Sequence, residues 1–344
     1  MRANCGPPCS RPFSVTSSIV CFTLLFVKGA PIELSHCSLR HRAPLTLPAI
    51  YAATTLGPNG KVYVFGGETG KVTHTLDATR IYDLDSDTWT LGAPMPVQVT
   101  EPSSALAMNA KIYVMGGGLQ VAGRQVTDAN NEYDPVSNSW RSRAPMPIGR
   151  TAFAIVAARN HKGHTLLYAI GGRNYKDDRN GLSSVEAYDP DTNSWEEMAP
   201  MPTYRHALSA ALGADGNIYV IGGAYRDSEP HFTAAVEVYD PRLNKWAKAP
   251  DAPCAVECAG VAATTGRNWM VYYCGGWYSP DKKDEASVFA YNPRSRSWKR
   301  LLDLPVATAA AGLVDLSRPR GRQSLLIIGG TPNGTSCTEY FLPE

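Results

Sequence analysis

Residues 132–147 read EYDPVSNSWRSRAPMP and residues 187–202 read AYDPDTNSWEEMAPMP, so nearly the same sixteen residues occur twice. The shared frame is a tyrosine, a tryptophan seven residues later and a proline seven residues after that, and it recurs in five places. Its tryptophans are Trp89, Trp140, Trp195, Trp246 and Trp298. Copies at regular spacing indicate a chain built from one repeated supersecondary unit.

A pair of glycines ends an apolar run before each copy, as in IYVMGG at 112–117, and a sixth run, LLIIGG at 325–330, has no tryptophan after it. The pairs are Gly66 and Gly67, Gly116 and Gly117, Gly171 and Gly172, Gly222 and Gly223, Gly275 and Gly276, and Gly329 and Gly330. Because glycine has no Cβ, such pairs allow neighbouring backbones to approach closely.

Each unit supports four short strands and no helix. Apolar stretches such as TAFAIVAA (151–158) alternate with turn dipeptides such as Asn-Gly at 59–60 and Asp-Gly at 215–216, which favour tight hairpins. No segment shows sustained helical periodicity. A four-stranded sheet of about fifty residues cannot cover both of its faces by itself. Such units arranged radially form a β-propeller.

The glycine pair, the Tyr-Asp-Pro step, the tryptophan and the Ala-Pro-Met-Pro segment together resemble the kelch repeat, over roughly residues 37–344. The resemblance implies a kelch-type β-propeller, and the six glycine pairs indicate six blades. The last unit stops at CTEYFLPE (337–344), before a fourth strand.

The segment HCSLRHRAPLTLP (36–48) fits that missing strand, with Pro48 at the motif proline and His41 at the tryptophan position. We therefore predict an all-β, six-bladed kelch-type propeller over residues 36–344, closed by an N-terminal strand that completes the last blade. Closure of this kind removes exposed sheet edges.

Residues 1–35 form a leader outside the repeats. Residues 1–32 contain no acidic residue, and the apolar run IVCFTLLFV (19–27) is too short to span a bilayer. A signal peptide, a transit peptide and a disordered leader all fit this pattern. The compartment, cytoplasmic or secreted, stays open on these grounds.

The composition argues against several classes of partner. The net charge of +2 does not favour binding to nucleic acid or to acidic membranes. The sequence offers no metal or cofactor motif, and we expect a monomeric propeller that needs neither. Cys37 and Cys337 fall in the same closing blade, so an oxidising compartment would allow a disulfide between them.

In an antiparallel four-stranded blade, the segment before the first strand and the segment after the glycine pair emerge on the same side, here called the loop face. Loops on a rigid scaffold usually carry the binding residues. The candidates on this face are Arg150, Arg173, Asn174, Tyr175, Tyr204, Arg205, His206, Tyr225, Arg226, Glu257, Trp277 and Tyr278. The same segments also contain Tyr51, Glu68 and Glu101.

Four arginines of this set, from units two to four, interleave with aromatic residues, a composition typical of interaction hot spots. A guanidinium matches carboxylate geometry. The resemblance to kelch substrate receptors likewise implies an acidic peptide held by arginines, which here would be Arg150, Arg173 and Arg205. We therefore predict a protein or peptide partner, acidic in character, and a separate adaptor protein if the chain acts as a substrate receptor.

A non-enzymatic role is the first hypothesis, with no catalytic residue assigned. The one close histidine pair, His161 and His164, lies in a polar hairpin turn, unlike the copper ligands that the resemblance to kelch-type radical oxidases would require. The alternative is a small carbohydrate-active propeller similar to the sialic-acid mutarotases, secreted in that case, with a site at the mouth of the central channel. Arg205, Arg226, His206 and Glu257 could supply its polar groups.

Overall fold

The structure, a computed structural model, describes residues 37–69, 74–120, 125–176, 181–226, 229–258, 260–263, 269–278, 283–316 and 323–342. The predicted leader, residues 1–35, lies outside the described residues. The described ranges hold no helix long and apolar enough to cross a membrane.

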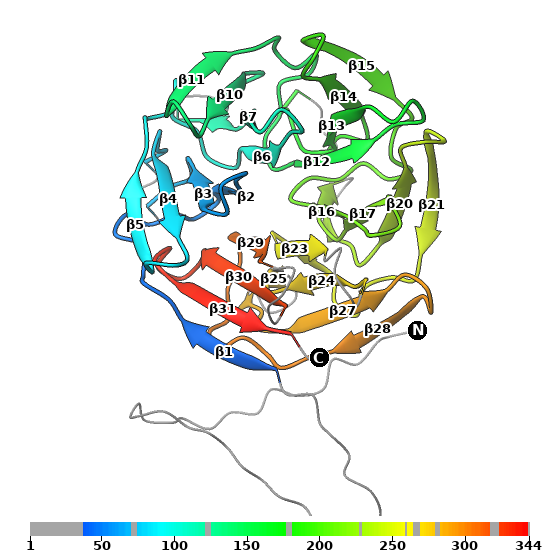
Figure 1. Cartoon of the computed structure of the whole chain (residues 1–344). Helices are drawn as coiled ribbons and strands as arrows, with labels where there is room; N and C mark the ends of the chain where they lie inside the picture. The colour runs from blue at the N-terminus through cyan, green and yellow to red at the C-terminus, as the bar shows by residue number, and fades with distance from the viewer. Residues whose placement is uncertain are drawn as a thin grey trace, which may run out of the picture.

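Six four-stranded antiparallel sheets are arranged as blades around a central axis (Figure 1), which confirms the predicted propeller. Blade 1 consists of β2 (Ala53–Leu56), β3 (Val62–Phe65), β4 (Thr79–Asp83) and β5 (Thr88–Leu91). Blade 2 consists of β6 (Ser103–Leu106), β7 (Ile112–Met115), β10 (Asn130–Asp134) and β11 (Ser139–Ser142). Blade 3 consists of β12 (Ala154–Arg159), β13 (Thr165–Ile170), β14 (Val185–Asp189) and β15 (Ser194–Met198).

The other three blades repeat this order, except that the sixth takes its outer strand from the N-terminus. Blade 4 consists of β16 (Ser209–Leu212), β17 (Ile218–Ile221), β20 (Val236–Asp240) and β21 (Lys245–Ala249). Blade 5 consists of β23 (Gly260–Ala263), β24 (Val271–Cys274), β27 (Val288–Asn292) and β28 (Ser297–Arg300). Blade 6 consists of β29 (Ala311–Asp315), β30 (Ser324–Gly329), β31 (Cys337–Phe341) and β1 (Ser38–His41).

The core is a ring of hydrophobic clusters, each shared by two neighbouring blades. Between blades 1 and 2, for example, Phe65 packs with Ile112 and Tyr133, all fully buried. Between blades 3 and 4, Ile170 packs with Val220 and Tyr239. Each sheet thus buries its faces only against its neighbours, as the repeat argument requires.

The tryptophan of the repeat joins adjacent blades. It lies opposite the repeat tyrosine in the same blade, as in the pair Tyr188 and Trp195, whose ring centroids are 5.1 Å apart. Its indole N–H donates to a carbonyl of the preceding blade: Trp195 Nε1 to Ala144 O, 3.0 Å. The other four repeat tryptophans do the same. The predicted packing role of this residue therefore includes a hydrogen bond between blades.

The glycine pairs lie where two backbones meet, as predicted. All six pairs have positive φ, and the N–H of the second glycine donates to a carbonyl that leads into the next blade, as from Gly172 to Arg205 O, 2.9 Å. A Cβ on Gly171, the first glycine of this pair, would lie 2.9 Å from the same Arg205 O. A larger residue would therefore separate the blades at this contact.

The N-terminal strand closes the ring, but its register differs from the prediction. Strand β1 pairs with β31, placing Leu39, and not His41, opposite Tyr340, where other blades have tryptophan. The N–H of Leu45 bonds to Thr335 O, as that of Met95 bonds to Asp77 O, so Ala-Pro-Leu-Thr (43–46) takes the place of Ala-Pro-Met-Pro. The predicted register was shifted by two residues because Pro48 was aligned with the motif proline of the other blades.

The side chain of Leu39 has no N–H to replace the tryptophan donor, and Tyr340 supplies a hydrogen bond to the preceding blade in its place. Its hydroxyl donates to Leu302 O at 2.7 Å, the carbonyl that corresponds to the tryptophan acceptors of the other blades. The side chain of Arg42 adds a bond of 2.6 Å to Glu339 in β31. The closing strand is thus held by both backbone and side-chain contacts.

The suggested disulfide does not form. Cys37 and Cys337 are both free thiols. Because β1 and β31 are antiparallel, with Ser38 opposite Phe341, Cys37 lies at one end of the strand pair and Cys337 at the other. Sharing a blade is therefore not enough to bring the two sulfur atoms together.

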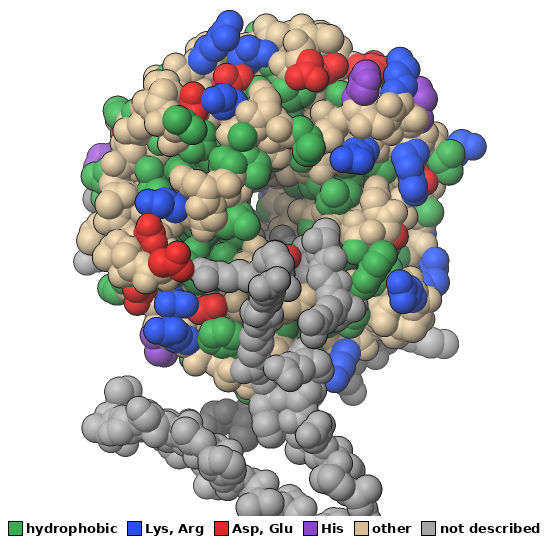
Figure 2. Space-filling view, in the orientation of Figure 1, with side chains coloured by type: hydrophobic (Ala, Val, Ile, Leu, Met, Phe, Trp, Pro, Cys, Tyr) green, Lys and Arg blue, Asp and Glu red, His purple; other side chains and the backbone are tan. Residues whose placement is uncertain are grey.

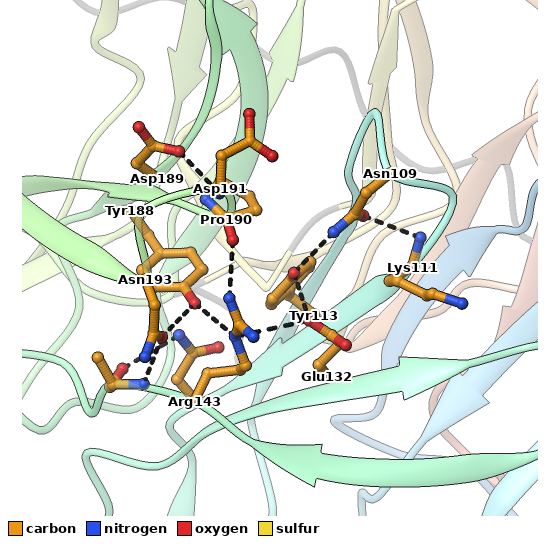
Figure 3. Close-up of polar contacts among 12 residues, drawn as sticks. Asn109, Lys111, Tyr113, Glu132, Arg143, Tyr188, Asp189, Pro190, Asp191 and Asn193 are labelled. Atoms are coloured by element: carbon orange, nitrogen blue, oxygen red, sulfur yellow. Dashed lines mark hydrogen bonds and ion pairs between the residues drawn. The ribbon is translucent and has the colours of Figure 1, made fainter.

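A polar network joins blades 2 and 3 on the face opposite the loops (Figure 3). Arg143 donates to the hydroxyl of Tyr188 at 3.0 Å and to Pro190 O at 2.7 Å. Its Nε lies 3.6 Å from Glu132, which accepts a hydrogen bond from Tyr113 at 2.6 Å. On the face opposite the loops, the polar groups of blades 2 and 3 are therefore hydrogen-bonded to one another.

Candidate binding site at the channel mouth

The loop face is built from the segments before each first strand and after each glycine pair, and in several blades these segments pair with one another. Thr151 pairs with Arg173, and His206 pairs with Ala224. Three small sheets extend this layer: β8 (Gly118–Leu119) with β9 (Gln125–Val126), β18 (Ala224–Arg226) with β19 (Pro230–Phe232), and β22 (Val256–Glu257) with β25 (Trp277–Tyr278) and β26 (Lys283–Asp284). The candidate residues thus belong to a hydrogen-bonded layer, which holds them in place.

A closed ring of backbone hydrogen bonds surrounds the channel on this side. Each blade contributes one residue, whose N–H donates to the carbonyl of the corresponding residue in the preceding blade. These residues are Tyr51, Glu101, Ala152, Ala207, Cys258 and Ala310. All six have φ between 50° and 56°, the left-handed region that is costly for residues other than glycine. The geometry of the mouth is therefore imposed by closure of the ring.

The ring residues line a hollow of about 130 Å³, together with the apolar residues that follow them, such as Pro102, Phe153 and Leu208. A space-filling view along the axis shows the ring open at its centre, with lysine, arginine, aspartate and glutamate side chains scattered over the blades (Figure 2). Sites that enclose a small molecule usually measure about 300–1,000 Å³. The hollow is therefore large enough for a side chain and small for a whole ligand.

Arg173 and Glu101 form an ion pair at the rim. Arg173 Nη2 lies 3.1 and 3.3 Å from the two carboxylate oxygens of Glu101, and the hydroxyl of Thr151 also donates to that carboxylate. The guanidinium lies 5.0 Å from the ring centre of Tyr175. Burial opposes the charge on Arg173, yet the attraction of Glu101 outweighs it and raises the pKa of Arg173. Arg173 therefore stays charged, and the Glu101 carboxylate neutralises its charge within the site.

Two further carboxylates flank the hollow. Burial raises the pKa of Glu257 to about 7, with Arg173 opposing this and Glu101 adding to it, and His206 Nε2 lies 4.0 Å from the Glu257 carboxylate. Burial and the charge of Glu101 also raise the pKa of Glu68. Across the described ranges, no group of three or more His, Cys, Asp or Glu is arranged to hold a metal ion. Among the described residues, the mouth therefore carries more carboxyl groups than guanidinium or ammonium groups.

Tyr51 and Cys258 present the other polar groups of the ring. Burial, followed by the charges around it, raises the pKa of the Tyr51 hydroxyl. Burial together with Glu257 and Glu101 raises the pKa of the Cys258 thiol well above its usual value. Both groups stay neutral near pH 7, and Cys258 is a poor nucleophile as a result.

An aromatic strip runs from the mouth across blade 4. Tyr225 stacks on His231 with ring centres 5.0 Å apart, and Tyr204 meets Tyr225 edge-on at 5.5 Å. On the other side of the same hairpin, Phe232 lies 5.6 Å from Trp277. All five side chains are half-buried. The strip is joined to the mouth through the pairing of His206 with Ala224, the residue before Tyr225.

Two of the four predicted arginines do not reach the surface. The side chains of Arg150 and Arg205 are fully buried, and each guanidinium pairs with a glutamate of its own blade, Glu186 and Glu237 respectively. Each also donates to the carbonyl of the first glycine of its blade, Gly171 in blade 3 at 3.0 Å. The expectation that these two arginines are displayed on the loop face is therefore wrong.

Among the remaining candidates, His206 is also buried, with 5% of its surface accessible. Arg226 is exposed at the end of β18, and Asn174, half-buried, accepts a hydrogen bond from the N–H of Lys176. The backbone of Tyr278 pairs with Val256, and its side chain lies outside the description. The sequence did not identify His231 and Phe232, which follow the glycine pair of blade 4 at a distance. The signal in the sequence was that aromatic residues stand on both sides of the polar stretch 226–230.

Comparison with known proteins agrees with this architecture. The family model described as Attractin/LZTR1 beta-propeller matches residues 62–336. Kelch-like protein 25 of Xenopus tropicalis is 31% identical over 267 residues, which cover 74% of this chain and 41% of that protein. Kelch-like protein 23 of Homo sapiens is 28% identical over 265 residues, which cover 77% of this chain and 43% of that protein. The chain thus spans less than half the length of these relatives.

The solved structure of YjhT matches with a TM-score of 0.67 at 19% identity and covers 87% of this chain and 95% of that one. At this identity the match supports the fold alone. The kelch-type propeller predicted from the repeats is confirmed.

Proposed function

Because the chain belongs to the Attractin/LZTR1 β-propeller family, we propose that it is a non-enzymatic interaction module that holds a protein or peptide segment on its loop face. The similarity to Kelch-like proteins supports a role in protein binding. The chain would act through the rigid channel mouth and the aromatic strip beside it.

The observation that carries this proposal is the aromatic strip. Tyr204, Tyr225 and His231 form one continuous set of ring contacts, and each keeps part of its surface open to solvent. Half-buried tyrosines give a large contact area at a low cost in conformational entropy, and they are enriched at protein interfaces. Arg226 lies exposed at the end of the same strand and adds a charged group to this surface.

The sequence predicted an acidic partner from four arginines, and only two of them, Arg173 and Arg226, reach the surface of the loop face. Arg173 is already paired with Glu101, so Arg226 is the arginine that would bind an acidic segment. The charge of the partner is therefore a separate question from the location of the site.

Affinity purification with mass spectrometry tests the location. The loop-face variant Tyr225→Ala with Arg226→Ala removes two side chains from β18. The matched control, Val136→Ala with Leu243→Ala, removes two exposed side chains, 91% and 65% accessible, from turns on the opposite face. We expect partners to disappear with the first variant and to persist with the second. A partner list that changes only with the control, or with neither variant, would count against the proposal.

A small carbohydrate-active propeller is the second candidate. One observation favours it: a carboxyl group with a pKa of about 7 lies 4.0 Å from a histidine beside the hollow, an arrangement suited to proton transfer. The small volume of the hollow favours binding of a side chain instead. Incubation with reducing sugars and sugar acids, followed by NMR of anomer exchange, would detect such an activity, and Glu257→Gln should abolish it.

A further inference from the structure

The charges at the mouth do not balance within the described residues. Arg173 is matched by Glu101, and Tyr175 covers one side of its guanidinium. Glu68 and Glu257 form no ion pair with a lysine or arginine in the part of the chain that the structure describes. Two carboxylates therefore remain beside the hollow after the one arginine has been accounted for.

The Tyr51 hydroxyl lies close enough to both carboxylates for their charges to raise its pKa. Tyr51 belongs to the ring around the hollow. On the opposite side, Glu257 lies against His206, and the pairing of His206 with Ala224 leads directly to Tyr225. Carboxylates together with the faces of aromatic rings are the groups that recognise ammonium and guanidinium ions.

We propose that the channel mouth receives the positively charged side chain of a lysine or arginine, carried by a partner segment whose neighbouring residues lie over the strip formed by Tyr204, Tyr225 and His231. The volume of the hollow, about 130 Å³, suits the end of one such side chain. This inference rests on the proposed interaction function, and it replaces the acidic partner predicted from the sequence with a basic one.

Binding of this kind depends on pH through Glu257. The groups that face it are His206 from blade 4, Arg173 from blade 3, Glu101 from blade 2 and the Cys258 thiol beside it. Its pKa is about 7, so if the cation requires the ionised form, affinity rises about tenfold between pH 6 and pH 8.

Selection from a random peptide library displayed on phage, with the immobilised full chain as bait, tests the inference. We expect the enriched peptides to share a lysine or arginine. Synthetic versions should bind Glu68→Gln and Glu257→Gln at least about tenfold more weakly than the wild type. They should bind the control Val136→Ala unchanged. Their affinity for the wild type should fall about tenfold from pH 8 to pH 6, while the affinity for Glu257→Gln should change much less.

Other outcomes separate this inference from the proposed function. Enriched acidic peptides whose binding is lost with Arg226→Ala would overturn the basic partner and leave the loop face as the interaction site. Peptides that bind every loop-face variant as well as the wild type would overturn both, as would the absence of enrichment over an unrelated propeller.

Discussion

Arg150 offers the sharpest test of how the loop face is built. Its guanidinium is fully buried and donates to Ile148 O, Gly171 O and Ser184 O and Oγ at 3.0–3.4 Å, in addition to Glu186. Burial lowers the pKa of Arg150 and raises that of Glu186, so each charge depends on the other for stabilisation. Arg150→Met would leave the Glu186 carboxylate buried without a cation.

Removal of one partner of a buried ion pair costs about 3–5 kcal/mol. At roughly 1.5 °C per kcal/mol for a propeller of this length, Tm should fall by about 5–8 °C. Adding Glu186→Met removes the orphaned charge and should recover part of this loss, because a buried pair replaced by apolar side chains is often close to neutral. The control Arg226→Met, an exposed arginine, should change stability by less than about 0.5 kcal/mol.

Differential scanning fluorimetry and urea unfolding would measure these changes. If Arg150→Met keeps the wild-type Tm but loses a partner, the guanidinium is accessible, and the original hypothesis of a ligand-binding arginine would be correct. If Glu186→Met lowers stability by the same amount in the Arg150→Met background as in the wild type, the two side chains do not interact.

Three further outcomes follow from the structure. Because burial raises the pKa of Glu257 from 4.5 to about 7, the folded state binds the proton of this carboxyl group more tightly than the unfolded state, and the resulting stabilisation is lost as pH rises through 7. The variant Glu257→Gln should therefore match the wild type in stability near pH 4.5 and be up to about 3 kcal/mol more stable at pH 8. Equal stability of the two proteins at both pH values would contradict the burial of Glu257. Trp140→Phe removes the hydrogen bond to Ala93 O and part of the ring but keeps an aromatic side chain, so it should cost about 1–2 kcal/mol, against about 3 kcal/mol or more for Trp140→Ala, as measured by urea unfolding; similar costs would refute the packing role. Arg42→Met breaks the partly buried pair with Glu339 that anchors the closing strand and should cost about 1–3 kcal/mol, while Arg40→Met, exposed on the same strand, should cost little; the reverse order would exclude the observed register of β1.

Most of the fold could be predicted from the repeats, because each repeated residue has a local physical role. The glycine pairs and the tryptophans mark contacts between blades, and the truncated last unit indicated the need for a closing strand. The register of that strand could not be predicted, because Pro48 and the true counterpart of the motif proline, Thr46, lie two residues apart in a segment without the tryptophan.

The candidate site was harder to predict because the sequence does not show which way a side chain turns. Arg150 and Arg205 follow the motif proline at the same distance, in a segment correctly placed at the loop face, yet both side chains turn inward. A signal was present: Glu186 and Glu237 occur at one position of the third strand in these two units alone, which couples each arginine to a buried partner. The backbone ring at the mouth, with alanine in the left-handed region at Ala152, Ala207 and Ala310, has no residue signature.

The most direct test of the account is site-specific photo-crosslinking in cells, with p-benzoylphenylalanine in place of Tyr225 on the loop face or Val136 on the opposite face. The account predicts a crosslinked protein from position 225, with the crosslink mapping to one short segment that contains a lysine or arginine, and none from position 136. Crosslinks from position 136 alone, or none from either position, would contradict the claim that the loop face around the channel mouth is the binding surface.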